Sequence, residues 1–331
     1  MNYRRFGRAG WQVSEIGYGM WGLAGWTGSD DAESMASLKR AIELGCNFFD
    51  TAWAYGEGKS EQILGKVLRE HKNDRDTGGP DKHLYVATKV PPKNRQWPSR
   101  RESTVDESYP PEYITEYVEK SLTNLGTETV DVMQFHTWED RWLNDERLPR
   151  AIEAMKKSGK VRAVGVSVNR WEPWNGIRAV LEGHVEAVQV IYNIFDQSPE
   201  DELFPVCREL NIGVIARVPL DEGSLAGELT AETRFPKNDW RSLYFGPENL
   251  TNTVARVDRL KKVLPKGMTL PEMALRFILS NPVVSTTIVG MRRPNHVHEN
   301  LAVSDAGPLD AALLRTLRRH RWDRRPQSWS D

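Results

Sequence analysis

The chain contains 331 residues, with 45 basic and 46 acidic side chains and a formal net charge of −1. This balance gives no electrostatic argument for a nucleic-acid or membrane-surface partner, and no apolar run reaches the length of a membrane span. The first ten residues lack the apolar core of a signal peptide, and Cys46 and Cys207 lie far apart in apolar segments. We therefore expect a cytoplasmic protein with two buried free thiols.

The first predicted elements are a hairpin and a strand. YRRF (3–6) and WQVS (11–14) flank GRAG and predict a short hairpin. The strand over 13–19 ends in GYGMWG (17–22), which has the G-x-G-x-x-G pattern of a dinucleotide-binding turn. That turn requires a helix directly afterwards, whereas the segment LAGWTGSD follows here. The next helix is predicted only over 31–44, where Asp30 and Glu33 have capping-box spacing. GYGMWG is therefore predicted to be a strand end that leads into a long loop.

Seven further apolar runs follow, and most are separated by amphipathic helical stretches. The runs are 46–52, 84–90, 130–136, 161–168, 187–193, 213–219 and 286–290, and the later helices lie near 114–125, 146–158, 201–211, 251–263 and 270–280. Nearly continuous β-branched strands that alternate with helices predict a parallel sheet covered by helices. Eight such units without a linker favour a single α/β domain over 1–331, a (β/α)8 TIM barrel with the hairpin as its plug. The stretches 91–110 and 220–285 are expected to be an extended loop and an elaborated seventh unit.

The chain ends with the basic cluster RRHRWDRR at 318–325. Closely spaced like charges are typical of a solvated segment, so we expect a solvated C-terminal tail in preference to a nucleic-acid-binding arm. The sequence leaves the oligomeric state open.

Four polar residues are predicted at the mouth of the barrel, where the carboxyl ends of its strands meet. Asp50 ends the second barrel strand, Lys89 the third and His136 the fourth, and Tyr55 follows Asp50 by five residues. Each alone has an ordinary structural explanation, but together they form a proton-transfer set. The Lys89 ammonium is expected to stabilise a Tyr55 phenolate and lower the pKa of Tyr55, with Asp50 holding Lys89 in place. No metal site is predicted.

These residues lie in motifs that resemble those of the aldo-keto reductase superfamily. DTAWAYGEGKSE (50–61) matches its D-T-A-x-x-Y…G-x-[ST]-E signature, ATK (87–89) its strand-three lysine, and SLTNLGTETVDVMQFH (121–136) its stretch that ends in a histidine. The resemblance extends over essentially the whole chain. It implies reversible reduction of an aldehyde or ketone with NAD(P)H, in which Tyr55 is the general acid/base, Lys89 tunes its pKa, Asp50 orients Lys89, and His136 positions the substrate.

The same resemblance assigns a cofactor site to the ends of the later strands. It implies contacts of the nicotinamide carboxamide with Ser167, Asn169 and Gln189, a pyrophosphate loop over 219–225, and an adenosine-phosphate site over 290–300. There a helix from about Pro294 offers its amino end to a phosphate. Arg292 and Arg293 favour NADP(H) over NAD(H), and Arg217 stands where an aromatic residue often stacks on nicotinamide. The implied contacts are Ser167, Asn169, Gln189, Arg217, Pro219, Leu220, Gly223, Gly290, Arg292, His296, Glu299 and Asn300.

The substrate is expected to be a small carbonyl compound. Trp21, Trp53 and Trp138 are the predicted pocket residues, and together with Trp26 they suit an aromatic or a sugar-like compound equally. Two other functions remain open. One is a regulatory or binding subunit, as in the channel-associated β-subunits of the same superfamily, and the other is a barrel aldolase that uses Lys89 as a Schiff-base nucleophile.

Overall fold

A closed barrel of eight parallel strands forms the centre of the molecule. The computed structural model describes residues 1–25, 29–71, 83–237 and 239–324. The strands pair in the order β10-β3-β4-β5-β6-β7-β8-β9, which confirms the predicted (β/α)8 TIM barrel. In chain order they are β3 (Ile16–Gly19), β4 (Phe48–Asp50), β5 (Tyr85–Val90), β6 (Val130–Phe135), β7 (Val161–Ser167), β8 (Ala187–Ile191), β9 (Gly213–Arg217) and β10 (Thr286–Gly290).

The strands are buried on both faces, because one face lines the barrel interior and the other lies under the helices. Every residue of β5 and β6 is buried, which explains the nearly continuous apolar runs in the sequence. The register places Asp50 opposite Ala87, and Lys89 opposite Gln134. The polar residues at the strand ends are therefore held at one level of the barrel mouth.

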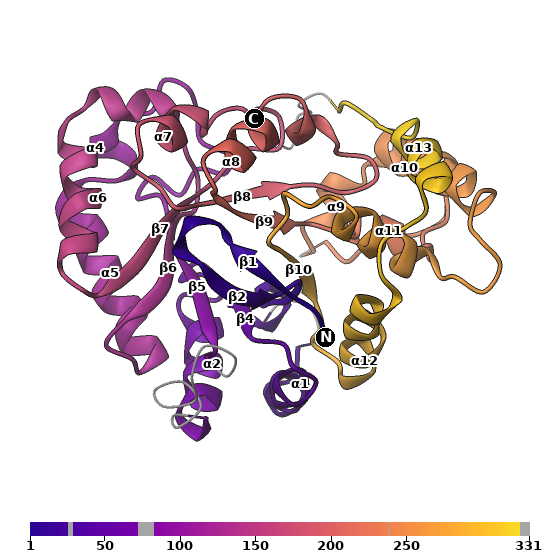
Figure 1. The fold of residues 1–331 in the computed structure, drawn as a ribbon, viewed down its shortest axis with the longest axis horizontal. Helices are drawn as coiled ribbons and strands as arrows, with labels where there is room; N and C mark the ends of the chain where they lie inside the picture. The colour runs from indigo at the N-terminus through magenta and orange to yellow at the C-terminus, as the bar shows by residue number, and fades with distance from the viewer. Residues whose placement is uncertain (26–28, 72–82, 238, 325–331) are drawn as a thin grey trace.

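Helices surround the barrel (Figure 1). They are α1 (Asp31–Glu43), α2 (Lys59–Glu70), α4 (Val105–Ser108), α5 (Pro111–Leu125), α6 (Arg147–Lys157), α7 (Ile177–Leu181), α8 (Leu203–Glu209), α9 (Arg241–Tyr244), α10 (Pro247–Lys261), α11 (Leu270–Leu279), α12 (Pro294–Ala302) and α13 (Ala311–Arg318). Short 3-10 helices are η1 (Gly7–Ala9), η2 (Trp21–Leu23), η3 (Asp140–Asn144), η4 (Ser198–Glu200), η5 (Asp221–Ala226) and η6 (Val303–Ala306). The helix predicted at 251–263 begins earlier, at Pro247, because proline is well suited to a first helical turn.

The predicted hairpin is confirmed and closes the amino-terminal end of the barrel. Strands β1 (Tyr3–Phe6) and β2 (Trp11–Ser14) pair antiparallel, and Figure 1 shows them in indigo in front of the barrel strands. Phe6 is wholly buried and packs against Phe48 of β4, with ring centres 5.6 Å apart. The hairpin therefore covers the apolar floor of the barrel and leaves the opposite end open.

The GYGMWG segment has the predicted structure of a strand end and a loop. Strand β3 ends at Gly19, η2 follows, and α1 begins only at Asp31, where the Asp30 side chain accepts a hydrogen bond of 2.8 Å from the Glu33 amide. A Cβ atom on Gly19 would lie 3.3 Å from the backbone of Val289. The glycine therefore allows close packing against β10. In the described parts of the segment and of the loop after it, no α-helix begins before Asp31 that could present its amino end to a phosphate.

The prediction of a solvated C-terminal tail agrees with the exposed Arg318 and Arg319 but is wrong for Arg321, Trp322 and Arg324. Arg321 forms an ion pair with Asp201, and Arg324 forms one with Asp221 in which only 5% of the arginine side chain is exposed. The backbone amide of Trp322 donates to the Phe195 carbonyl over 2.8 Å. Acidic partners supplied by the barrel loops compensate the local positive charge, and the tryptophan anchors the segment. Residue 325 lies outside the described residues.

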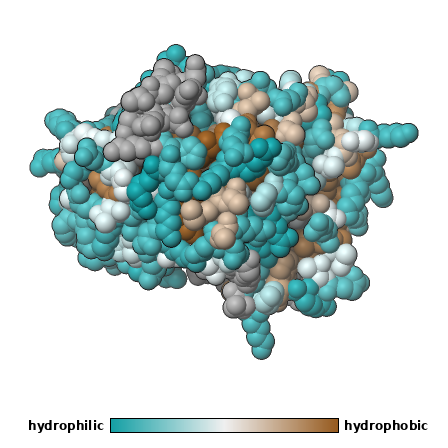
Figure 2. Space-filling model, turned by 90° about the horizontal axis from the view of Figure 1, so that it is seen from below, coloured by the Kyte–Doolittle hydropathy of each residue, from teal (hydrophilic) through white to brown (hydrophobic). Residues whose placement is uncertain are grey.

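The remaining surface features agree with the composition. Cys46 and Cys207 are buried free thiols, as predicted. Figure 2 shows a face on which hydrophilic residues predominate and apolar residues gather only in small groups. Within the described ranges, the helices all fall short of the length and apolar character needed to cross a membrane.

Candidate active site

The four predicted proton-transfer residues meet at the open end of the barrel. Asp50 ends β4, Lys89 lies near the end of β5, His136 directly follows β6, and Tyr55 lies in the loop between β4 and α2. The Lys89 ammonium is 5.0 Å from the centre of the Tyr55 ring. The rings of Tyr55 and His136 meet edge to face with centres 5.6 Å apart. The structure thus brings together side chains from three strand ends and one loop.

A buried ion pair underlies this group. The Lys89 ammonium donates to Asp50 Oδ1 over 2.6 Å and to the Thr51 carbonyl over 2.7 Å. The other carboxylate oxygen, Asp50 Oδ2, accepts hydrogen bonds from Gln134 at 3.1 Å and from Gln189 at 2.7 Å. At most 2% of either charged side chain is exposed. Because both oxygens of Asp50 are occupied, the direction of the Lys89 ammonium is fixed.

Burial raises the pKa of the Tyr55 phenol above its ordinary value of 10, although the nearby Lys89 ammonium lowers it. The expected direction of the lysine effect is therefore right, but the expectation of a lowered pKa for Tyr55 is wrong. The physical reason is that loss of hydration disfavours a phenolate more than the neighbouring cation favours it. Tyr55 consequently carries its proton at neutral pH, as a proton donor must.

His136 is a neutral imidazole at neutral pH. Burial, reinforced by the positive charges of Lys89 and Arg217, holds the pKa of His136 well below 6.5. Its Nδ1 atom is buried and makes no hydrogen bond. The Trp97 ring meets the imidazole edge to face, with centres 5.7 Å apart. His136 can therefore position a ligand by hydrogen bonding without adding charge to the site.

This protonation state gives a direct prediction. In an NMR titration of the intact protein, the imidazole resonance of His136, assigned by its loss in His136→Gln, should titrate well below pH 6.5. The reason is that protonation would place a third cation beside Lys89 and Arg217 in a poorly hydrated site. A midpoint at or above 6.5 would contradict the assignment of a neutral His136.

A cavity of about 320 Å³ opens beside His136. Its walls include three predicted cofactor contacts, Ser167, Asn169 and Arg217. Arg217 ends β9 and donates from Nη2 to the Val168 carbonyl over 3.1 Å, whereas its buried Nε atom makes no hydrogen bond. The cavity therefore has donors available for a ligand rich in hydrogen-bond acceptors.

Gln189 and Asn169 are engaged with the protein itself. The Gln189 amide nitrogen binds Asp50, and the Asn169 side-chain oxygen accepts a hydrogen bond of 3.1 Å from the Trp171 amide. Gln189 is not among the residues that line the cavity. In this structure its amide thus supports the Lys89–Asp50 pair rather than facing a ligand.

The predicted phosphate-binding segments lie after β9 and β10. Pro219, Leu220 and Gly223 belong to the loop that contains η5, and Gly290 ends β10 with open space where a Cβ would stand. Arg293 directly precedes α12, and its side chain makes no capping hydrogen bond with the amide groups of the first helical turn. Arg292 is half-buried, and its Cδ lies 3.8 Å from the Cβ position of Gly22. Farther along α12, His296 is half-buried, Glu299 is exposed and Asn300 is buried.

The predicted substrate-pocket tryptophans lie in different places. Trp21 is 42% exposed and meets Trp240 edge to face, with ring centres 6.3 Å apart. Trp53 packs on Tyr117, outside the set of residues that line the cavity. Trp138 belongs to the cavity wall but has no exposed surface, because the indole is packed in the core. Trp26 lies outside the described residues.

Trp97 and Trp240 were not among the predicted site residues, although both line the cavity. Trp97 comes from the long 91–110 loop, and Trp240 directly precedes α9. Neither segment has a repeating pattern of hydrophobic residues that indicates which way a side chain points. The only available signal was the presence of a tryptophan in a long loop, which is equally typical of simple packing.

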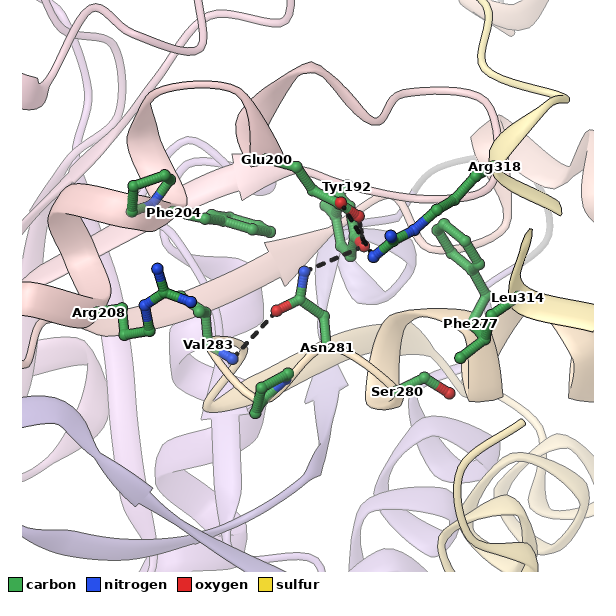
Figure 3. Close-up of a pocket in the computed structure, with 12 residues that line it drawn as sticks. Tyr192, Glu200, Phe204, Arg208, Phe277, Ser280, Asn281, Val283, Leu314 and Arg318 are labelled. Atoms are coloured by element: carbon green, nitrogen blue, oxygen red, sulfur yellow. Dashed lines mark hydrogen bonds and ion pairs between the residues drawn. The ribbon is translucent and has the colours of Figure 1, made fainter. Parts of the chain in front are cut away.

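A second cavity, of about 270 Å³, lies outside the barrel between α8, the end of α11 and α13 (Figure 3). Four of its polar side chains, Tyr192, Glu200, Asn281 and Arg318, bind one another. Asn281 donates to the Tyr192 hydroxyl over 3.3 Å, and Arg318 lies 3.4 Å from Glu200. In the described part of the chain, no residue lining this cavity has a buried polar side-chain atom without a hydrogen bond. The cavity at the barrel mouth is therefore the better candidate for a ligand site.

The fold is a (β/α)8 barrel with four predicted site residues gathered at its mouth, and comparison with known proteins identifies its family. A model of the Aldo/keto reductase family matches residues 15–321. The chain is 30% identical over 305 residues to the aldo-keto reductase YhdN of Bacillus subtilis, which covers 90% of this chain and 87% of that protein. It is 29% identical over 323 residues to a probable voltage-gated potassium channel subunit beta of Oryza sativa subsp. japonica, with 93% of each chain covered.

A solved structure agrees with these sequence comparisons. The holo form of aldo-keto reductase AKR11C1 from Bacillus halodurans superposes with a TM-score of 0.75, at 25% identity and with 100% of both chains covered. The chain belongs to the aldo-keto reductase family. It is an NAD(P)H-dependent oxidoreductase that acts on a small carbonyl compound.

Proposed function

We propose that the chain reduces an aldehyde or ketone to an alcohol with Tyr55 as the proton donor. The observation that carries this proposal is the buried Lys89–Asp50 ion pair, with its ammonium 5.0 Å from the Tyr55 ring. A protonated phenol beside a fixed cation can give its proton to a carbonyl oxygen as negative charge develops there. The negative charge that remains on the phenol is then stabilised by Lys89.

The other residues act on the same oxygen or on Tyr55. His136 is neutral and has an unpartnered ring nitrogen, so it can orient the carbonyl group without competing for the proton. Asp50 holds the Lys89 ammonium in position through Oδ1. The nicotinamide cofactor, when bound, supplies the hydride that adds to the carbonyl carbon. The proton of Tyr55 completes the alcohol at the oxygen.

The residues along β7, β9 and β10 fit such a cofactor. Ser167 and Asn169 lie in the same cavity wall as the unpartnered Arg217 Nε, a donor that suits the carbonyl oxygen of a nicotinamide carboxamide. Open space at Gly290 and the uncapped start of α12 suit a phosphate. Because Arg292 and Arg293 lie at the same place, we assign NADP(H) as the preferred cofactor, with the arginines binding the 2′-phosphate.

Arg292→Ala should weaken binding of NADPH and leave binding of NADH nearly unchanged. We expect a loss of roughly 1–3 kcal/mol for NADPH, the scale of one charged hydrogen-bond partner. Fluorescence titration of both cofactors measures the difference. Equal weakening of NADH and NADPH would place 2′-phosphate recognition elsewhere in the chain.

Trp21→Ala serves as the comparison variant for a residue assigned to the substrate. The half-exposed indole lies against Trp240 at the cavity rim, so its removal should raise KM for the carbonyl substrate far more than Kd for either cofactor. Loss of cofactor binding in a folded Trp21→Ala protein would contradict the assignment of this tryptophan to the substrate side.

Trp97 and Trp240 support a substrate with a flat apolar face, either an aromatic carbonyl compound or a sugar-like one. Rates measured with NADPH on aromatic aldehydes and on sugar aldehydes of similar size distinguish the two classes. Lack of turnover across both panels, despite cofactor binding, would favour the alternative of a binding subunit.

The aldolase alternative is disfavoured by the site itself. A Schiff-base lysine reacts as a neutral amine, whereas the Lys89 ammonium is held by Asp50 at 2.6 Å. Borohydride treatment in the presence of a carbonyl compound should therefore leave Lys89 unmodified.

A further inference from the structure

The loop after β9 has an unusual backbone. Val218, Asp221, Glu222 and Gly223 have φ values of 57°, 45°, 55° and 98°. Glycine adopts such values readily, whereas other residues do so rarely and β-branched residues least of all. A backbone of this kind persists only where the surrounding contacts determine it. The contacts made by this loop, residues 218–226, therefore control whether it keeps its conformation.

Asp221 is the buried anchor of the loop. Its carboxylate is completely inaccessible, and each of its two oxygens accepts a hydrogen bond of 2.7 Å from Arg324. The Ser224 hydroxyl donates to the same carboxylate over 2.6 Å, within the loop itself. The Tyr244 hydroxyl is more distant, at 3.4 Å. Arg324 therefore supplies the only bidentate contact to Asp221 among the described residues.

Arg170 is a weaker neighbour of the same loop. One of its nitrogens lies 3.7 Å from Asp221 and 3.5 Å from Glu222, and its Nε lies 3.6 Å from Asp196. The Arg170 Nε and Nη2 atoms make no hydrogen bond. Arg170 thus contributes positive charge near the loop but does not hold Asp221 in a defined geometry.

The segment that carries Arg324 is itself fixed to the barrel. The ring of Trp322 meets that of Phe195 edge to face at 5.9 Å, and the Arg256 guanidinium lies 4.2 Å from the Trp322 ring. The Trp322 amide donates to the Phe195 carbonyl. Arg324 is thus delivered to the loop by an anchored segment that follows α13, far from the loop in sequence.

We propose that Arg324 is a positioning residue that controls exchange of the cofactor. By holding Asp221, it keeps the 218–226 loop in the one conformation that fits the cofactor's pyrophosphate, so that the cofactor dissociates only when this contact loosens. The inference rests on the proposed function, because residues 219–225 are assigned there to the pyrophosphate. It adds a contribution from the C-terminal segment, which touches the loop and not the reacting atoms.

The test compares Arg324→Gln with Arg321→Gln. Arg321 comes from the same segment and also forms a bidentate pair, with Asp201 at 2.7 and 2.6 Å, but that pair is half-exposed and does not involve the loop. We expect Arg324→Gln to raise the dissociation rate of NADPH, measured by stopped-flow fluorescence, by about tenfold or more, because a loop whose buried carboxylate has lost its ion-pair partner opens more often. Arg321→Gln should leave that rate unchanged.

Hydrogen exchange provides a second readout that does not depend on the cofactor. In Arg324→Gln without cofactor, the amides of residues 218–226 should exchange faster, whereas in Arg321→Gln they should exchange as in the unaltered protein. Arg324→Lys, which keeps the charge but cannot form the bidentate pair, should lie between the two. Thermal unfolding of each variant establishes that the protein is folded under the conditions of measurement.

The outcomes separate this inference from the proposed function. If the unaltered protein binds NADPH and Arg324→Gln releases it at the same rate, the role of Arg324 is wrong while the proposed function stands. Equal acceleration in both variants would also overturn the inference, because it would reflect general loosening of the segment. If the unaltered protein binds neither NADPH nor NADH, the proposed function fails. Unchanged hydrogen exchange of residues 218–226 in Arg324→Gln would then overturn the inference that this contact controls the loop.

Discussion

Tyr55→Phe is expected to lose most of kcat, on the order of 10²–10⁴-fold, which is the usual contribution of general acid catalysis. Phenylalanine keeps the ring that lies edge to face with His136 at 5.6 Å, so the site should remain packed. Only the proton that is donated to the carbonyl oxygen is removed. The Kd for NADPH should therefore stay within a few-fold of the original value, as measured by fluorescence titration.

This result depends on chemistry being the slow step. A single-turnover measurement with pre-bound NADPH separates chemistry from product release. If Tyr55→Phe kept more than about a tenth of the original single-turnover rate, well above what loss of a general acid allows, Tyr55 would not be the proton donor and His136 would become the leading candidate.

Lys89→Met should be about as damaging to kcat as Tyr55→Phe. Lys89 lowers the pKa of a phenol that burial already raises, so its loss makes the phenolate still less accessible. Its loss also leaves the Asp50 carboxylate buried without its ion-pair partner, which typically costs about 3–5 kcal/mol of stability. Asp50→Asn should cost less activity, since the ammonium stays bound to the Thr51 carbonyl.

The double variant D50N/K89M separates the two effects of the lysine substitution. Replacing the carboxylate by an amide removes the uncompensated buried charge, so thermal stability should recover in part while kcat stays low. Full activity in a folded Lys89→Met protein would show that Tyr55 does not need the ammonium, and the pairing of these two residues would be wrong.

The parts of the fold that follow local rules could be predicted from the sequence. Strands buried on both faces leave continuous apolar runs, and the capping group at Asp30 marks where α1 begins. Strand-end residues such as Asp50, Lys89 and His136 could be placed at one mouth because a parallel barrel offers only one geometry for its carboxyl ends.

What the sequence could not reveal depends on contacts between distant segments. The pairing of Arg324 with Asp221 joins residues separated by 103 positions, and neither has a local pattern that indicates burial. The pKa of Tyr55 depends on how deeply the loop between β4 and α2 is buried, and the DTAWAY motif alone does not specify that burial. The aromatic wall supplied by Trp97 depends likewise on the path of a long loop.

Carbonyl reduction is tested most directly by transfer of a deuteride to a reducible aldehyde from NADPH that carries deuterium at both positions of its reactive carbon. We expect the intact protein to place deuterium on the carbinol carbon of the alcohol, and Tyr55→Phe to bind the same cofactor but form product far more slowly. Tight binding of NADPH by the intact protein with no deuterium in any alcohol, across aromatic and sugar-like aldehydes, would contradict carbonyl reduction by this protein.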